Sequence, residues 1–493
     1  MMKMGHFFIL LEFVFLIAMC GSDSGEVKPL PPYDLTGKLA DTYSKYQEKS
    51  ISDRRFKHSE LVPLINKLGA NFEVEKAGKS IEGRDIYLVK TGKGPIKVLL
   101  WSQMHGDEST ATMALLDIFN FLGQNDEFDA LRQQLREQLT IYFIPMLNPD
   151  GAERFERRNA LGIDLNRDAQ RLQCPESQLL KRIRDQTDAD WGFNLHDQSR
   201  YYAAGSKANT ATLSFLAPAY NEQKEINQVR GDAMRLIGWM NTQLQPLIPG
   251  KIAKYYDGFE PRAFGDNIQK WGTSTVLIES GGLANDREKQ EIRKFNYLAL
   301  LTAMDAIANR RYAPVSLDAY NKIPFNNGNA FHDLILREVE VEKEGNWYMV
   351  DIAFRNNERD MDGNREFYYR SSVSDIGDLS IFYAYEDFPG KGYRAVPGKT
   401  YPEVLPNINA LKKLDASKLW REGYTSVRLQ VVPQGQLYSQ YPLQLLSGNG
   451  NPETDIISGT NPALLLQKDG QTRFVVVNGF LFDVQEGVKW ERY

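Results

Sequence analysis

A histidine and a glutamate three residues apart, His105 and Glu108, are the residues of this chain best suited to chemistry. An imidazole and a carboxylate at this spacing can bind one divalent cation together, and this donor set suits zinc. A catalytic site also needs a third protein ligand and an open coordination position for water. Because His-x-x-Glu occurs by chance in many chains, the other groups must be found elsewhere in the sequence.

The elements around this pair favour a functional site. Residues 96–103 form an apolar run that predicts a buried strand. Residues 109–122 carry apolar side chains at helical spacing and predict the following helix. His105 and Glu108 therefore lie on the turn between a strand and a helix. In open α/β sheets, ligands bind at this edge.

Two further side chains follow predicted strands. His196 comes directly after the short apolar stretch 191–195, and it is one of only five histidines in the chain. It is a candidate third ligand, with a purely structural histidine as the alternative. Glu279 ends the predicted buried strand 275–278. A carboxylate is costly to bury there, so we interpret Glu279 as a candidate general base.

Composition excludes several classes of protein. The chain has 493 residues, a net charge of −5 and no basic run, which argues against binding to nucleic acid. Cys20 and Cys174 are the only cysteines, so a disulfide framework is excluded and a zinc-thiolate site is not expected. Nothing in the sequence indicates the oligomeric state.

The N-terminal residues 1–20 predict a signal segment. Lys3 precedes an apolar stretch, residues 7–19, that is too short to span a bilayer comfortably. Cys20 with the following glycine and serine resembles a bacterial lipoprotein cleavage site. We expect export to the periplasm or the medium, and a lipid anchor on Cys20 is one of two alternatives.

The remaining chain divides into two parts by texture. Residues 35–312 alternate predicted strands and helices, which predicts an α/β fold with a mainly parallel, mixed sheet covered by helices on both faces. Within it, residues 34–68 are expected to be helical. Residues 315–493 carry alternating apolar runs and hairpin turns and predict a mostly-β accessory region. Residues 360–364 predict a hairpin turn, because the alternative calcium loop lacks its full ligand spacing.

The motifs occur in a characteristic order: His105-x-x-Glu108, Asn148-Pro149-Asp150-Gly151, Asp164-Leu165-Asn166-Arg167, His196 and Glu279. This order resembles the zinc carboxypeptidase family of the carboxypeptidase A type over about residues 40–310. The resemblance implies one zinc ion per chain, bound by His105, Glu108 and His196. It also implies that Glu279 deprotonates the attacking water and later protonates the leaving amine.

The resemblance assigns further residues to the substrate. Arg157 would stabilise the oxyanion. Asn166 and Arg167 would bind the C-terminal carboxylate, for which the planar guanidinium is well suited. The mobile tyrosine of the family would be Tyr256, with Tyr255 as the alternative.

The predicted function is a zinc metallocarboxypeptidase that releases C-terminal residues from peptides, with peptidoglycan stem peptides as one substrate class. A zinc amidoacylase acting on N-acyl amino acids is the second enzyme hypothesis. The third hypothesis is an inactive cell-envelope binding protein. The Asn148-Pro149-Asp150-Gly151 turn and the pair Asn166-Arg167 favour the peptidase.

Overall fold

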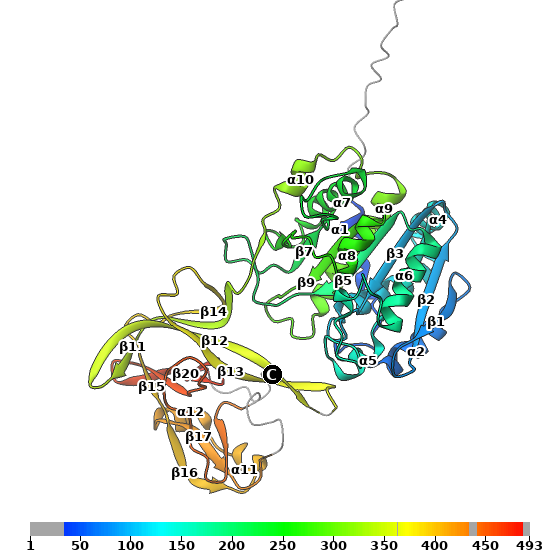
Figure 1. The fold of residues 1–493 in the computed structure, drawn as a ribbon. Coiled ribbons are helices and arrows are strands. Elements are labelled where there is room, and N and C mark those ends of the chain that lie inside the picture. The colour runs from blue at the N-terminus through cyan, green and yellow to red at the C-terminus, as the bar shows by residue number, and fades with distance from the viewer. Residues whose placement is uncertain (1–33, 362, 433–440, 487–493) are drawn as a thin grey trace, which may run out of the picture.

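The computed structural model describes residues 34–361, 363–432 and 441–486 (Figure 1). The predicted signal segment 1–20 and Cys20 lie outside the described residues. Among the described helices, none is long and apolar enough to cross a membrane. Two parts of the chain are distinguished below: the α/β unit, residues 34–327, and the β region, residues 331–486.

The α/β unit is built on one eight-stranded sheet. Its four central strands, β4, β3, β5 and β9, run parallel to one another, and the next strand on each side pairs antiparallel with this group. In spatial order the strands are β1 (Glu73–Lys79), β2 (Asp85–Gly92), β4 (Leu139–Ile144), β3 (Ile96–Ser102), β5 (Trp191–Asp197), β9 (Ser274–Ser280), β7 (Leu213–Leu216) and β8 (Ile252–Lys254). The predicted mixed α/β sheet is confirmed.

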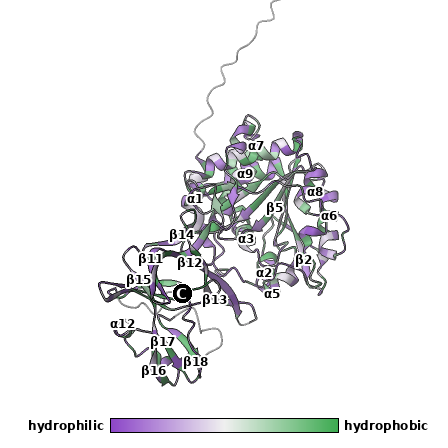
Figure 2. Cartoon of the chain, turned by 60° about the vertical axis from the view of Figure 1, so that its left-hand side comes forward, coloured by the Kyte–Doolittle hydropathy of each residue, from purple (hydrophilic) through white to green (hydrophobic). Residues whose placement is uncertain are grey.

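Helices cover both faces of this sheet, as the alternation within β3 requires. Val98 and Leu100 point into one core, and Leu99 and Trp101 point into the other. The first core contains side chains of α3 (Thr110–Gly123), α7 (Gln228–Leu244) and α9 (Gln290–Ala308), whereas the second contains those of α6 (Pro175–Thr187) and α8 (Phe264–Lys270). Figure 2 colours much of the strands of this sheet as hydrophobic and the helices as a mixture of hydrophobic and hydrophilic residues. Burial of two apolar faces stabilises the position of the strand ends.

The expectation of a continuous helical segment over residues 34–68 is wrong in its middle. Helix α1 (Leu35–Thr42) and a short 3₁₀ turn, η1 (Tyr43–Lys45), come first, and α2 (His58–Asn66) starts only after an irregular stretch. In that stretch Tyr46, Ile51 and Phe56 are buried. A spacing of five residues cannot place these side chains on one face of a helix of 3.6 residues per turn.

The β region consists of two sheets, which confirms the predicted mostly-β character. The larger sheet has the order β13 (Glu366–Gly377), β12 (Asn346–Met361), β11 (Phe331–Lys343), β15 (Arg394–Pro397), β19 (Leu464–Lys468), β20 (Gln471–Val477) and β21 (Phe480–Asp483), with β14 (Tyr383–Pro389) paired to β11. The smaller, parallel sheet contains β16 (Lys399–Leu405), β17 (Tyr424–Leu429) and β18 (Gln444–Ser447), with α11 (Ile408–Leu411) and α12 (Ala416–Arg421) beside it.

The strands β12 and β13 pair antiparallel up to Met361 and Glu366 and form a hairpin. Asp360 and Met361 of the predicted turn belong to β12, and residue 362 lies outside the described residues. Figure 1 shows this hairpin extending beneath the α/β unit.

The packing of the α/β unit continues beyond the predicted end at residue 312. Helix α10 (Leu317–Asn321) packs against α7, and Tyr320 and Ile323 are buried in the α/β core. Strand β10 (Asn326–Asn327) then pairs with β6 (Ala203–Ala204). The first strand of the β region starts only at Phe331.

Candidate active site

The turn after β3 places His105 and Glu108 through a close backbone approach. The side chain of Gln103 donates to the carbonyl of Gly106 at 2.9 Å. A Cβ atom on Gly106 would lie 2.0 Å from the carbonyl carbon of Gly151. Only glycine fits at such a distance. Asn148, which caps α5 (Pro149–Arg154), and the first residues of this helix therefore support the His105 turn from behind. The predicted turn at 148–151 is thus the start of a helix.

His196 reaches the same point from the neighbouring strand β5. Its Nδ1 lies 2.6 Å from Glu108 Oε2 and 3.1 Å from His105 Nδ1. His105 Nδ1 lies 2.8 Å from Glu108 Oε1. Among the residues that the structure describes, this is the one group of three possible ligand side chains that converges in this way.

The donor set fits a metal ion. In tetrahedral zinc sites with bonds of 2.0–2.1 Å, neighbouring donor atoms are about 3.3 Å apart. The three side chains are buried, and their donor atoms are 2.6–3.1 Å apart, somewhat closer than this spacing. Asp164 Oδ1 lies 3.0 Å from His105 Nε2, the nitrogen that faces away from the cluster. A carboxylate in this position orients a histidine ligand and fixes its tautomer.

The electrostatics of the cluster favour positive charge. Burial alone would lower the pKa of His105, but the carboxylates of Glu108 and Asp164 outweigh it and raise this pKa to about 9. Burial would raise the pKa of Glu108, but the two histidines hold it well below its usual range. A site that stabilises an imidazolium between carboxylates also stabilises a bound divalent cation.

Glu279 lies opposite His196 in the register of the parallel strands β5 and β9. Its side chain lines the same cavity, of about 650 Å³, as the three cluster residues. Burial and the nearby charge of Glu108 raise the pKa of Glu279 well above its usual value. A carboxyl group with a raised pKa next to a set of metal-ligating side chains is suited to proton transfer.

Arg157 reaches the cluster from the loop after α5 (Pro149–Arg154). Its guanidinium contacts Asp164 Oδ2 at 3.1 Å, Glu108 Oε1 at 3.2 Å and His105 Nδ1 at 3.1 Å. Asp164 thus holds both His105 and Arg157. Its role was missed in the sequence, because this carboxylate is 59 residues away from His105 in the chain.

Asn166 and Arg167 lie on another wall of the cavity, in the 3₁₀ turn η2 (Leu165–Arg167). The Asn166 side-chain oxygen accepts a hydrogen bond of 2.9 Å from the backbone N–H of Phe264, so its amide nitrogen stays available as a donor. Arg167 Nε lies 3.3 Å from Glu260 Oε2. The acidic partner Glu260 was not identified from the sequence.

Both candidate tyrosines line the cavity, in different environments. Tyr256 is 69% exposed, and its ring lies 5.0 Å from Lys224 Nζ. Tyr255 is half-buried. Burial and the charge of Glu279 raise the pKa of the Tyr255 phenol, so the Tyr255 hydroxyl interacts electrostatically with the candidate base.

Comparison with known proteins agrees with this geometry. Residues 64–232, which include His105, Glu108, Arg157, Asn166, Arg167 and His196, match the family model described as zinc carboxypeptidase. This segment of the chain is therefore similar to the zinc carboxypeptidase family. Carboxypeptidase SOL1 of Arabidopsis thaliana is 32% identical over 97 residues, which are 18% of this chain and 20% of that protein.

Other relatives are similar to this chain over limited stretches. Carboxypeptidase D of Anas platyrhynchos is 27% identical over 167 residues, which are 28% of this chain and 12% of the relative. This chain therefore spans at most about a fifth of the length of these two curated relatives. A solved metallo-carboxypeptidase from Burkholderia cenocepacia is 20% identical, with 52% of this chain and 69% of that chain covered and a TM-score of 0.40.

Proposed function

We propose that this protein is a zinc-dependent carboxypeptidase that removes C-terminal residues from peptides with a free C-terminal carboxylate. The observation that carries the proposal is the convergence of His105, Glu108 and His196 in one cavity with Glu279. Two imidazoles, a ligand carboxylate and a separate buried carboxylate are the protein groups that metal-assisted peptide hydrolysis needs.

The residues of the chain would divide the chemistry as follows. A zinc ion, when bound, polarises the scissile carbonyl and makes water more acidic. Glu279 accepts the proton of the attacking water and delivers it to the leaving amine. The guanidinium of Arg157, which is anchored on Asp164, stabilises the negative charge that develops on the carbonyl oxygen.

Recognition of the free C-terminus would come from Asn166 and Arg167. The amide nitrogen of Asn166 donates to the substrate carboxylate, since its oxygen is used by Phe264. Arg167 is already paired with Glu260, so the substrate carboxylate competes with Glu260 for this guanidinium. Selectivity for free C-termini then depends on how much more strongly Arg167 binds the substrate carboxylate than the carboxylate of Glu260.

The test is cleavage of one set of peptides in acid and amide forms, read by mass spectrometry. We expect single residues to be released from the acid forms and little from the amide forms. Muropeptides with free stem C-termini form a second arm, which tests the peptidoglycan substrate class. Equal cleavage of acid and amide forms would contradict an exopeptidase, and hydrolysis of N-acyl amino acids alone would identify an amidoacylase.

We also propose that the protein is exported and anchored through Cys20, on the strength of the apolar stretch 7–19 and the residues after Cys20. Fractionation of cells that express the wild type or Cys20→Ser tests the anchor. A wild-type protein in the membrane fraction and a released variant are expected. Equal release of both proteins would exclude the lipid.

A further inference from the structure

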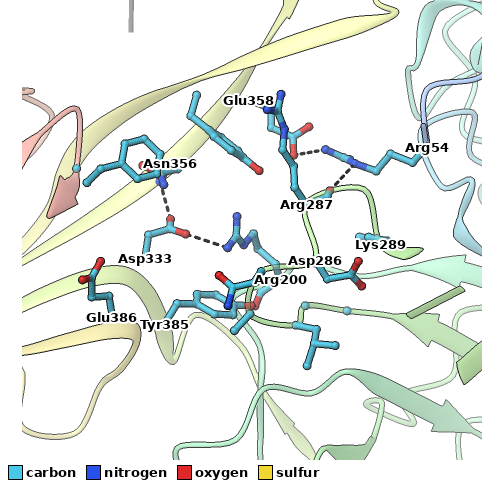
Figure 3. A pocket seen from close by; sticks show the side chains of 18 of the residues that line it. Arg54, Arg200, Asp286, Arg287, Lys289, Asp333, Asn356, Glu358, Tyr385 and Glu386 are labelled. Carbon is cyan, nitrogen blue, oxygen red and sulfur yellow. Dashed lines mark hydrogen bonds and ion pairs between the residues drawn. The ribbon is translucent and has the colours of Figure 1, made fainter. Parts of the chain in front are cut away.

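The β region contacts the α/β unit beside the candidate active site. A cavity of about 620 Å³ lies between the two parts. Figure 3 shows that Arg54 and Arg200 of the α/β unit point toward Glu358 and Asp333 of the β region. Charges are therefore paired across this boundary. Three segments of the α/β unit are bonded to the β region.

The first segment is the loop 198–206, which directly follows the strand that carries His196. Asp333 on β11 accepts a hydrogen bond of 2.6 Å from the Tyr201 hydroxyl and lies 3.1 Å from the Arg200 guanidinium. The Tyr385 hydroxyl on β14 donates to the backbone carbonyl of Arg200 at 2.6 Å. The backbone N–H of Phe331 donates to the carbonyl of Tyr201 at 3.0 Å. The loop is thus held by side chains and backbone of the β region.

The second segment follows Glu279. A Cβ atom on Gly282 would lie 2.1 Å from the Tyr385 hydroxyl oxygen, so the β region packs directly on this backbone. Further along, Arg287 donates to the carbonyl of Phe367 on β13 at 2.7 Å. Lys289 Nζ then contacts Asp197 at 2.9 Å and the carbonyl of Ser280 at 3.1 Å, which links the second segment to the ends of β5 and β9.

The third segment is the irregular stretch before α2. Arg54 and Arg55 both pair with Glu358 near the end of the β12–β13 hairpin, and Arg55 also contacts Asp360 at 2.7 Å. The hydroxyl of Ser109, the residue after Glu108, donates to the backbone carbonyl of Arg54. The hairpin therefore holds a segment that contacts the ligand turn.

We propose that the β region is a positioning element of the active site, with Asp333 as its principal positioning residue. This inference rests on the proposed function. The three segments adjoin His196, Glu279 and Glu108, and each is bonded to the β region. Asp333 is 8% exposed and accepts from Tyr201, from Arg200 and, at 2.7 Å, from the backbone N–H of Asn356. Its removal leaves the Arg200 guanidinium and the backbone N–H of Asn356 without this acceptor, whereas the Tyr201 hydroxyl keeps the carbonyl of Asn356 at 2.9 Å.

The positioning role predicts a particular kinetic signature. Asn166 and Arg167 are positioned by α8 and the loop before it, through Phe264 and Glu260, and not by the three segments. A loosened loop 198–206 should therefore disturb His196 and Glu279 while carboxylate binding persists. We expect Asp333→Ala to lower kcat at least tenfold and to change KM less than twofold.

The experiment compares the full-length wild type, Asp333→Ala and the control Asp375→Asn. Asp375 is an exposed carboxylate on β13 of the same sheet. Each protein is also loaded with Co²⁺ in place of zinc, because the visible absorption of this ion reports the geometry of its ligands. We expect an altered Co²⁺ spectrum and weaker Co²⁺ affinity in Asp333→Ala, and wild-type values in the control.

A folded Asp333→Ala with wild-type kcat and wild-type Co²⁺ spectrum would overturn the inference. If this variant does not fold, Tyr385→Phe decides, since it removes only the hydroxyl that donates to Arg200. A several-fold lower kcat at unchanged KM supports the inference, and an unchanged kcat overturns it. If the wild type releases no C-terminal residues, the proposed function fails, while the Co²⁺ spectra still test the positioning role.

Discussion

At the scale of single residues, Glu279 and its neighbour Glu108 are two carboxylates with different duties. The pKa of Glu108 is held low by two histidines, whereas burial and the charge of Glu108 raise the pKa of Glu279. Glu279→Gln keeps the shape of the side chain but cannot accept a proton. We expect kcat to fall by about 10²–10⁴-fold, with metal content unchanged, measured by steady-state kinetics and metal analysis. Glu176→Gln, the same change at a buried position of α6, is the control, and full activity in Glu279→Gln would refute the base assignment.

Arg167 should fail in a different way from Glu279. Its guanidinium contacts the substrate carboxylate both in the ground state and in the transition state, so Arg167→Ala should mainly raise KM. A lost charged hydrogen bond is worth about 2 kcal/mol, which corresponds to roughly 30-fold in KM. Arg262→Ala is the matched control, because Arg262 also pairs with Glu260 but is more exposed. A similar KM in both variants would contradict the assignment of Arg167 to binding of the substrate carboxylate.

His332 gives a pH dependence that is independent of the metal cluster. It is buried on β11 with Ser374 as a partner, and burial, together with the charges of Arg355 and Arg337, lowers its pKa to about 4. The unfolded chain binds a proton below about pH 6.5 that the folded chain does not bind until about pH 4. The free energy of unfolding should therefore fall by up to about 3 kcal/mol as the pH drops through this window.

Denaturant unfolding at pH 7.5 and pH 4.5 measures this loss. His332→Gln does not titrate, so its stability should change less between the two pH values than that of the wild type. An identical pH dependence in both proteins would show that another group is responsible.

At the scale of elements, the connection between the two parts is an accessible segment. Residues 324–329 are mostly exposed, whereas Tyr320 and Ile323 just before them are buried. We expect a nonspecific protease to cut the native protein first within 324–329. Because ion pairs and hydrogen bonds join the two parts on both sides of the cavity, the two fragments should elute together in gel filtration. A first cut within residues 340–480, or separation of the fragments without denaturant, would contradict this description.

At the scale of the whole molecule, the metal ion should couple the site to global stability. We expect about one zinc ion per chain, and its loss in His105→Ala, because the remaining two ligands leave an incomplete coordination shell. A ligand that binds only the folded state stabilises it, so a chelator should lower the Tm of the wild type and not that of His105→Ala. His58→Ala is the control, since His58 contacts the carbonyl of Asp85 away from the cluster. Full zinc content in His105→Ala would refute the ligand assignment.

Local patterns in the sequence were sufficient to predict much of the fold. The apolar run 96–103 and the helical spacing of 109–122 predicted that His105 and Glu108 lie on a strand-to-helix turn. In the structure they lie between the end of β3 and the start of α3. Strand ends at His196 and Glu279 followed from the same reasoning. These predictions succeed because a buried parallel strand is an apolar run whose end is local information. Parallel order then brings such ends to one edge.

The sequence by itself thus determined the ligand and base candidates, the α/β class and the mostly-β character of the C-terminal third of the chain. Only the tertiary structure decided that Asp164 holds His105, that Glu260 pairs with Arg167, and that Asp333 holds the loop after His196. It also decided that residues 46–57 are irregular. The physical reason is that these three contacts join residues 59 to 133 positions apart in the chain, through charged side chains that carry no periodic signal. A carboxylate in a loop looks the same in the sequence whether it faces solvent or a buried arginine.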